Sequence, residues 1–280
     1  VAVGRVVEGL FDGGVGAGDL EGRGVGDSEQ EDTVRMLRAV RIANKLGFGI
    51  EAATAAPIRE LAPLLTDVPS ARLFDEVLKL FLSEQAEKNF DDLVDYGLFQ
   101  QLFPRTGACL DQPGVETLIR GALQGTAQRV REDKPVTPAF LYAALLWPVV
   151  RQDMESALAE GQSLAQAIPT FSGDVVTEQV ETVAIPRRFS TPMREIWALQ
   201  PRFYRRNGRR PERLAAHPRF RAAYDFLLLR TAAGEEDPEL AQWWTDYQEG
   251  QAPTPPASSE RPKRRRRRRR RRPAADSASE

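Results

Sequence analysis

Asp32 and Arg35 carry complementary hydrogen-bonding groups three residues apart, in a segment with strong helical character. Side chains at this spacing lie within one helical turn and reach the same small ligand. A carboxylate accepts hydrogen bonds and a guanidinium donates them, which complements an exocyclic amine beside a ring acceptor nitrogen. Adenine and cytosine both present that edge. The spacing also fits an ordinary ion pair on a solvated helix, so the pair alone leaves both interpretations open.

Two arginine-rich tracts carry a second kind of chemistry, the binding of polyanions. The first interleaves arginines with Phe203 and Tyr204, which sets phosphate donors beside rings able to stack on bases. The second lacks apolar partners, so self-repulsion keeps it extended, although such runs also occur as solubilising or import-like signals. The candidate RNA-binding residues are Arg202, Arg205, Arg206, Arg209, Arg210 and Arg213 in the first tract, and Lys263, Arg264, Arg265, Arg266, Arg267, Arg268, Arg269, Arg270, Arg271 and Arg272 in the second.

The aromatic and apolar residues around the first tract are expected to serve the core more than a ligand. Trp197, Leu199 and Phe203 lie at helical spacing, and an apolar face of this kind usually buries itself. The arginines are therefore the better RNA candidates.

The net charge of −1 hides a strong segregation of charge along the chain. Residues 1–186 carry 16 basic against 28 acidic groups, whereas residues 187–230 carry 12 arginines against three acids. Residues 231–260 hold seven acids and no bases, and residues 261–280 hold 11 bases against two acids. The basic blocks favour a polyanionic partner such as RNA.

Several classes of site are excluded by composition. A single cysteine, Cys109, and a single histidine, His217, rule out a disulfide framework, multi-cysteine zinc sites and histidine metal clusters. Cys109 is expected to be a small apolar group, and His217 a loop or cap residue. The longest apolar stretch, residues 139–150, is too short to cross a bilayer, and no signal peptide is visible. We expect a cytoplasmic protein without a membrane partner.

The chain resembles a known family from Glu31 onward. Glu31-Asp32-x-x-Arg35-Met36-Leu37-Arg38-Ala39-x-Arg41, followed by Lys45-Leu46-Gly47-Phe48, is similar to the motif that opens the neck of class II template-independent nucleotidyltransferases. This family contains bacterial poly(A) polymerases and CCA-adding enzymes. The likeness covers residues 26–249 and continues, in family order, through residues 56–58, 69–80 and 96–104, while residues 185–188, 194–200 and 217–225 favour the poly(A) polymerase branch.

The resemblance implies roles for particular residues. Asp32 and Arg35 would read the incoming base, and Arg72 and Glu76 would belong to the helix that braces theirs. The complete enzyme would transfer AMP from ATP to RNA 3′ ends, with ATP as substrate and Mg²⁺ as cofactor. A CCA-adding enzyme stays open as an alternative because cytosine offers Asp32 and Arg35 the same edge, and a noncatalytic RNA-binding module is the second alternative.

The family performs its chemistry in a head domain before the neck, where an Asp-x-Asp pair binds magnesium. This chain contains no Asp-x-Asp, and the residues before Glu31 are too few for a strand-rich nucleotide-binding domain. We therefore predict no catalytic residue and no metal ligand in this chain, which by itself should not catalyse. Truncation or a reading-frame error upstream would account for the missing head.

The periodicity predicts an all-α fold. A neck at 31–104 and a body at 105–249, with the basic segment 187–230, would lie between a disordered Gly-rich segment 1–30 and a disordered tail 250–280. Helices are expected at residues 32–46, 51–65, 70–81, 84–96, 115–131, 137–150, 154–167 and 174–184. Joints are expected at Pro113, Pro135, Pro138, Pro186 and Pro192. In the first helix, Met36, Leu37, Val40, Ala43 and Leu46 form the apolar stripe, and Gly47 ends the helix.

Overall fold

The computed structural model describes residues 25–250, with side chains from residue 33 onward. Every regular element in this range is a helix, which confirms the predicted all-α fold. The predicted disorder of residues 1–24 and 251–280, and the second arginine tract at 263–272, lie outside the described residues. The helices are α2 (Val25–Leu46), α3 (Ala52–Leu61), the 3₁₀ helix η1 (Ala62–Asp67), α4 (Ser70–Phe81), α5 (Ala86–Asp95), α6 (Leu98–Leu102), α7 (Pro104–Ala108), α8 (Val115–Arg131), α9 (Pro138–Ala159), α10 (Leu164–Thr182), α11 (Arg187–Phe203), α12 (Arg210–Ala215), α13 (Phe220–Ala232) and α14 (Pro238–Gln248).

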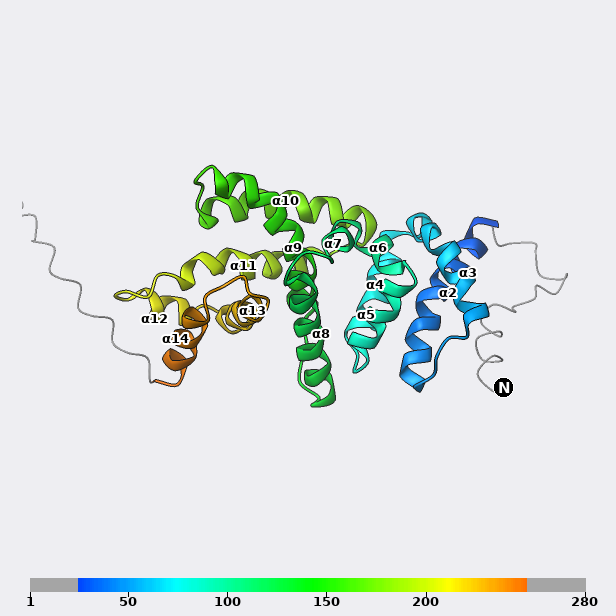
Figure 1. The fold of residues 1–280 in the computed structure, drawn as a ribbon, viewed down its shortest axis with the longest axis horizontal. Coiled ribbons are helices and arrows are strands. Elements are labelled where there is room, and N and C mark those ends of the chain that lie inside the picture. The colour runs from blue at the N-terminus through cyan, green and yellow to red at the C-terminus, as the bar shows by residue number, and fades with distance from the viewer. Residues whose placement is uncertain (1–24, 251–280) are drawn as a thin grey trace, which may run out of the picture.

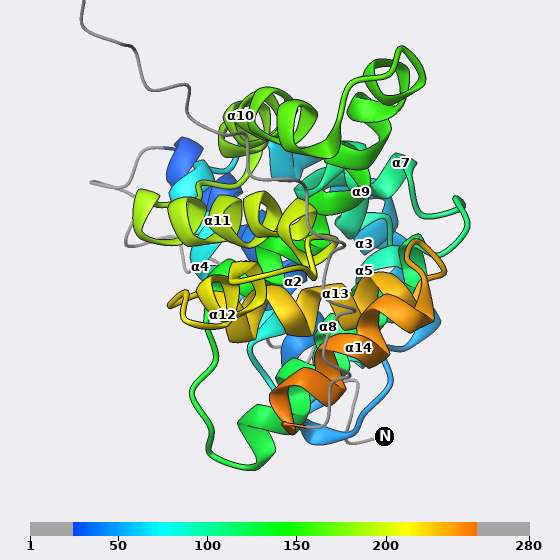
Figure 2. The same ribbon diagram turned by 90° about the vertical axis from the view of Figure 1, so that its left-hand side faces the viewer.

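The described helices form an elongated assembly (Figure 1). Helices α2 and α3 lie at one end of the long axis, α8 and α9 lie near the middle, and α12 and α14 lie at the other end. Viewed along that axis, α11, α12, α13 and α14 stand in front of the remaining helices (Figure 2). A large apolar core runs from Val34 in α2 to Phe226 in α13, and a smaller core joins the end of α11 to α12, α13 and α14.

Helix α9 is the central element of the large core. Every residue from 141 to 150 is buried, as expected for a helix that is apolar all round. The Trp147 ring meets Phe226 edge-on, with centroids 5.5 Å apart, and lies 6.3 Å from the Trp197 ring. No helix within residues 25–250 combines the length and apolarity that spanning a bilayer requires.

Several predicted helix boundaries are wrong between residues 137 and 184. Helix α9 continues through Pro148 to Ala159, and the predicted helices 154–167 and 174–184 are replaced by the end of α9 and a single α10. The true break lies at Gly161, whose φ of 89° suits glycine, and at Ser163, which forms a capping box with Gln166. Turn and cap residues therefore decide this boundary, whereas Pro148 is buried inside α9 and does not end it.

Two further joints differ from the prediction. The predicted helix 51–65 divides into α3 and η1, whose second residue is Pro63, a residue without the N–H that an uninterrupted helix would use. Pro192 lies inside α11 and marks no joint. Helices α4 and α8 have the predicted bounds.

Helix α2 is longer than predicted and its apolar stripe is shorter. It begins at Val25, so residues 25–30 are helical although no helix was expected there. Met36, Leu37, Val40 and Ala43 are buried, but Leu46 is 50% exposed because the chain leaves the core in this last turn. Gly47 ends the helix with a φ of 71°, as predicted.

Candidate nucleic-acid interface

The predicted base-reading pair belongs to α2. Asp32 lies in this helix, but its side chain is outside the described residues, so its pairing with a base stays a prediction. Arg35 is partly exposed and has an interaction of its own within the structure. Six residues further on in the same helix, Arg41 Nε is buried without a hydrogen-bond partner among the described residues.

Helix α4 braces α2 through a buried carboxylate. Glu76 is 2% exposed, and its Oε1 accepts from Lys79 Nζ at 2.9 Å and from Arg38 Nε at 3.5 Å. Arg72 lies on the same helix, one turn before Glu76. The ion pair with Arg38 fixes α4 against the helix that carries Arg35.

Helix α5 holds the other end of α2 through amide side chains. Asn44 Nδ2 donates to Asn89 Oδ1 at 3.0 Å and to Asp92 Oδ2 at 2.7 Å. Asn89 in turn donates to the Leu80 carbonyl at 2.7 Å, which links α5 to α4. Burial raises the pKa of the Asp92 carboxyl, and the hydrogen bond from Asn44 opposes that rise.

The first arginine tract lies where α11 ends and α12 begins. Arg202 is in the last turn of α11, and Arg205, Arg209, Arg210 and Arg213 are exposed. None of these exposed four forms an ion pair with another described residue. Their guanidinium groups are therefore available to phosphates.

Arg206, the sixth residue of the tract, lies over an aromatic ring. Its guanidinium carbon is 5.9 Å from the centroid of Trp243 in α14. Such an arrangement orients the guanidinium while leaving its N–H groups free to donate.

The smaller core presents this tract to solvent. Phe203 is buried and meets the Trp244 ring edge-on at 5.1 Å, and Trp244 Nε1 donates to the Phe203 carbonyl at 2.9 Å. Trp197 and Leu199 are buried as well, so the expectation that these aromatic and apolar residues face the core is confirmed. Anchored by Phe203, the chain turns through Gly208, whose φ is 63°, and the arginines are left outside.

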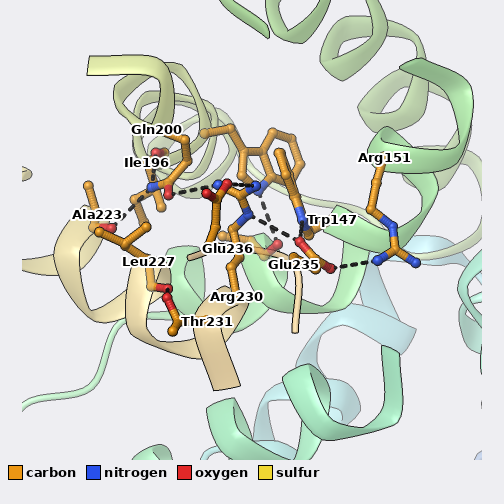
Figure 3. A network of polar contacts seen from close by, with 12 residues as sticks. Trp147, Arg151, Ile196, Gln200, Ala223, Leu227, Arg230, Thr231, Glu235 and Glu236 are labelled. Carbon is orange, nitrogen blue, oxygen red and sulfur yellow. Dashed lines mark hydrogen bonds and ion pairs between the residues drawn. The ribbon is translucent and has the colours of Figure 1, made fainter. Parts of the chain in front are cut away.

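A buried ionic network lies between α9, α13 and the loop before α14 (Figure 3). Arg230 of α13 donates to Glu235 at 3.1 Å and to Glu236 at 2.5 Å, and all three side chains are at most 6% exposed. Glu235 also accepts from Trp147 Nε1 at 2.8 Å and from Arg151 at 2.9 Å, both on α9. The network thereby joins α13, the loop before α14 and α9.

The basic tract is attached to this network through Tyr204. Its hydroxyl donates to Glu236 at 2.6 Å, although the residue is 47% exposed. Burial, followed by the neighbouring Glu236 carboxylate, raises the pKa of Tyr204 to about 12, so the phenol keeps its proton. The neutral Tyr204 hydroxyl therefore connects the basic tract to the buried Glu236 carboxylate.

A groove between α10 and α11 adjoins the tract. Two cavities of about 270 and 100 Å³ share Ile168, Pro169 and Ala198 as lining residues. Arg194 and Glu195 line one cavity, and Arg202 and Arg205 line the other. Arg194 was not among the predicted RNA-binding residues, and the excess of arginines over acids in residues 187–230 is the signal that points to it.

The structure does not bring the two predicted sites together. Helix α2, with Arg35, lies at one end of the long axis, and α12 lies at the other (Figure 1). A ligand that touches both must be long, which a nucleotide is not and an RNA strand is.

The isolated cysteine and histidine behave as predicted. Cys109 is fully buried, its thiol donates to Gln152 Oε1 at 3.3 Å, and burial raises the pKa of the thiol. His217 Nδ1 accepts from the backbone N–H of Arg219 at 3.1 Å in the loop before α13. Among the described residues, no three His, Cys, Asp or Glu side chains are grouped so that they fit a metal ion.

Comparison with known proteins identifies the family to which this helical chain is related. The chain matches two family models, described as "Probable RNA and SrmB- binding site of polymerase A" over residues 47–110 and "Polymerase A arginine-rich C-terminus" over residues 160–274. These matches make the chain a relative of the poly(A) polymerase nucleotidyltransferases, and one of them covers a region described as a probable RNA-binding site. More particularly, the chain is a relative of bacterial poly(A) polymerase I and corresponds to a C-terminal portion of it.

Individual relatives support this relationship. Poly(A) polymerase I of Salmonella typhimurium is 42% identical over 230 residues, which is 80% of this chain and 50% of that protein. Poly(A) polymerase I of Haemophilus influenzae is 42% identical over 224 residues, or 78% of this chain and 50% of that protein. The CCA-adding enzyme of Limosilactobacillus reuteri is 43% identical over 70 residues, covering 25% of this chain and 17% of that enzyme. The chain thus spans about half the length of its poly(A) polymerase I relatives.

Proposed function

We propose that the chain supplies the RNA-binding and base-recognition parts of a cytoplasmic poly(A) polymerase, which adds AMP from ATP to RNA 3′ ends. The observation that carries this proposal is the group of exposed arginines Arg205, Arg209, Arg210 and Arg213, which lack carboxylate partners among the described residues. The kinship with poly(A) polymerase I supports it. On this proposal the arginines hold the RNA backbone and α2 meets the incoming nucleotide.

The arginines suit a polymerase that has no template. Guanidinium contacts to phosphates position a strand without reading its sequence. The grip must therefore tolerate any RNA, whereas selection of the added nucleotide falls to Asp32 and Arg35. In our proposal Asp32 accepts from the adenine amine and Arg35 donates to the ring nitrogen.

Within residues 33–250, no three His, Cys, Asp or Glu side chains are grouped so that they could hold a metal ion. We therefore assign magnesium no ligand and no catalytic step in this part of the chain. The magnesium-dependent chemistry of the proposed enzyme belongs to a head domain, and this chain alone is expected not to transfer AMP.

A CCA-adding enzyme is the second candidate function. The 43% identity to the Limosilactobacillus reuteri enzyme over 70 residues favours it locally. The longer match to poly(A) polymerase I, which includes the arginine-rich segment, favours polyadenylation.

A chimaera tests the proposal. The chain would be joined to the head of poly(A) polymerase I from Salmonella typhimurium and supplied with RNA, magnesium and either ATP alone or ATP with CTP. We expect a homopolymeric A tail, and we expect Arg35→Ala to lower the rate about 10-fold or more at limiting ATP, since a charged hydrogen bond is lost. A terminating C-C-A product would instead identify the second candidate, and RNA binding with no effect of Arg35→Ala would identify a noncatalytic RNA-binding module.

A further inference from the structure

One cavity among the described residues is separate from both predicted sites. It has a volume of about 370 Å³ and lies between α8, the loop before α9, and α13. Helices α8 and α13 lie between α12 and α2 along the long axis (Figure 1). A cavity of this size is within the range that accepts a small molecule or a single nucleotide.

Two glycines of α8 shape this cavity differently. A Cβ on Gly121 would approach Leu229 Cδ2 of α13 to 2.7 Å, so this glycine permits the close packing of the two helices. A Cβ on Gly125, one turn later, would meet no atom within 4 Å. Gly125 therefore faces open space, and its missing side chain keeps that wall of the cavity clear.

The walls of the cavity are apolar and well supported. Pro135, Val136, Phe140, Ala222 and Leu229 line it. Arg129 donates from Nε and Nη2 to the Pro135 carbonyl at 3.1 and 2.9 Å, which fixes the loop that forms one side. The partly exposed Phe140 ring and the flat proline suit a planar heterocycle.

The polar groups of the cavity favour an anion. Arg129, Arg219 and Arg221 line it together with Asp225, the one carboxylate among its lining residues. Asp225 holds Arg221, whose Nε donates to Oδ2 at 3.2 Å and whose Nη2 lies 3.0 Å from Oδ1. Three guanidinium groups thus outnumber one carboxylate, and that carboxylate already orients one of them.

The cavity is joined to the basic tract. Arg219 and Arg221 follow Arg213 closely in sequence, and Arg219 Nε donates to Glu195 of α11 at 3.0 Å. A strand held by the arginines of α11 and α12 would reach the cavity on its way toward α2. This geometry agrees with the requirement, stated above, that a ligand touching both ends must be long.

We propose that this cavity binds one nucleotide of single-stranded RNA, with the base against Phe140 and Pro135 and its phosphates at Arg219 and Arg221. The inference rests on the proposed function, because it needs an RNA strand on the arginine tract. It adds a subsite that selects single-stranded RNA through an unstacked base. Duplex RNA, whose bases are paired, does not enter it.

Gly125→Leu tests the proposal by filling the cavity. Leucine favours helix over glycine and has open space here, so the variant should fold at least as well as the parent chain. The matched control is Gln128→Leu, an exposed position on the same helix that does not line the cavity. Binding of fluorescent oligoadenylate to the full chain is measured by anisotropy, with heparin as an anion that has no bases.

We expect Gly125→Leu to weaken oligoadenylate binding about 10-fold, the loss of one stacked base, while heparin binding and the Gln128→Leu control keep the parent affinity. Equal oligoadenylate affinities in all three chains would overturn the subsite and leave the proposed function standing. Equal losses for oligoadenylate and heparin would also overturn it, because the cavity would then act on charge alone. Absence of RNA binding by the parent chain would overturn the proposed function as well.

Crosslinking supplies a second measurement that needs no variant. Oligoadenylate with a single photoreactive base is irradiated with the full chain, and the modified peptides are identified. We expect a crosslink in the peptide that contains Phe140. Crosslinks confined to other peptides would contradict the assignment.

Discussion

At the scale of single residues, burial separates the charged groups that hold the fold from those offered to a ligand. Glu76 and Arg230 are at least 96% buried and have partners of opposite charge, whereas Arg205, Arg209 and Arg210 are exposed. Residue type alone does not reveal this division, since all the arginines of residues 187–230 look alike in the sequence. Arg230 belongs to the basic excess of that segment, yet its charge is paired with Glu235 and Glu236 in an internal network.

Asp92 gives a residue-scale prediction about pH. Burial raises the pKa of its carboxyl above the ordinary value of 3.8, so the folded chain holds that proton more tightly than the unfolded chain. Stability contributed by this group is present at acidic pH and is lost as the pH rises through the folded-state pKa. Asp92→Asn removes this loss and keeps an oxygen to accept from Asn44. We therefore expect the stability of the variant, relative to the parent, to improve from acidic to neutral pH.

Urea unfolding at a series of pH values measures that difference. A relative stability that stays constant, or falls toward neutral pH, would show that burial does not disfavour the ionised Asp92 carboxylate.

At the scale of elements, the sequence predicts most helices and misplaces several of their ends. Helices α4 and α8 follow from a strong apolar periodicity between clear boundaries. The break between α9 and α10 was missed because it depends on Gly161 and the Ser163 cap. Pro148 is the stronger helix-breaking signal in the sequence, yet it lies inside a buried helix. The smaller core and the 370 Å³ cavity could not be predicted, because both depend on contacts between segments far apart in the chain.

The ionic network of Arg230 gives a prediction at this scale. Arg230→Met would leave Glu235 and Glu236 buried, with only Arg151 as a counter-charge for the first. We expect the free energy of unfolding to fall by about 3–5 kcal/mol, the usual result of removing one partner of a buried ion pair. Urea unfolding monitored by tryptophan fluorescence measures it.

Arg120→Met is the matched control for this substitution. Arg120 also has two acidic partners, Asp91 and Glu116, but its side chain is 34% exposed. Loss of such a pair typically costs about 1 kcal/mol or less. Similar losses in the two variants would mean that the buried network does not fix α13 against α9.

At the scale of the whole molecule, the elongated shape places the two predicted sites at opposite ends. The neck helix α2 and the basic end at α12 are separated along the long axis, with the α8–α13 cavity between them (Figure 1). An RNA strand spanning these points would be gripped by phosphate contacts at one end and would present its terminus near α2. The sequence predicted the residues of both ends, but their separation and the cavity between them follow only from the arrangement of the helices.

The salt dependence of RNA binding tests the central claim, that the arginines at the junction of α11 and α12 bind the RNA backbone. Oligoadenylate affinity of the full chain would be measured over a range of salt concentrations. The test variant carries Arg205→Gln, Arg209→Gln and Arg210→Gln. The charge-matched control carries Lys45→Gln, Arg131→Gln and Lys134→Gln, which are exposed cations in the last turn of α2, the last turn of α8 and the loop after α8. If each arginine of the test variant contacts one phosphate, its log–log salt slope becomes shallower by about two, because each lost contact to single-stranded RNA removes roughly 0.7 of a released counterion. The account predicts that change in the test variant and little change in the control; an unaltered slope, or equal changes in both, would contradict it.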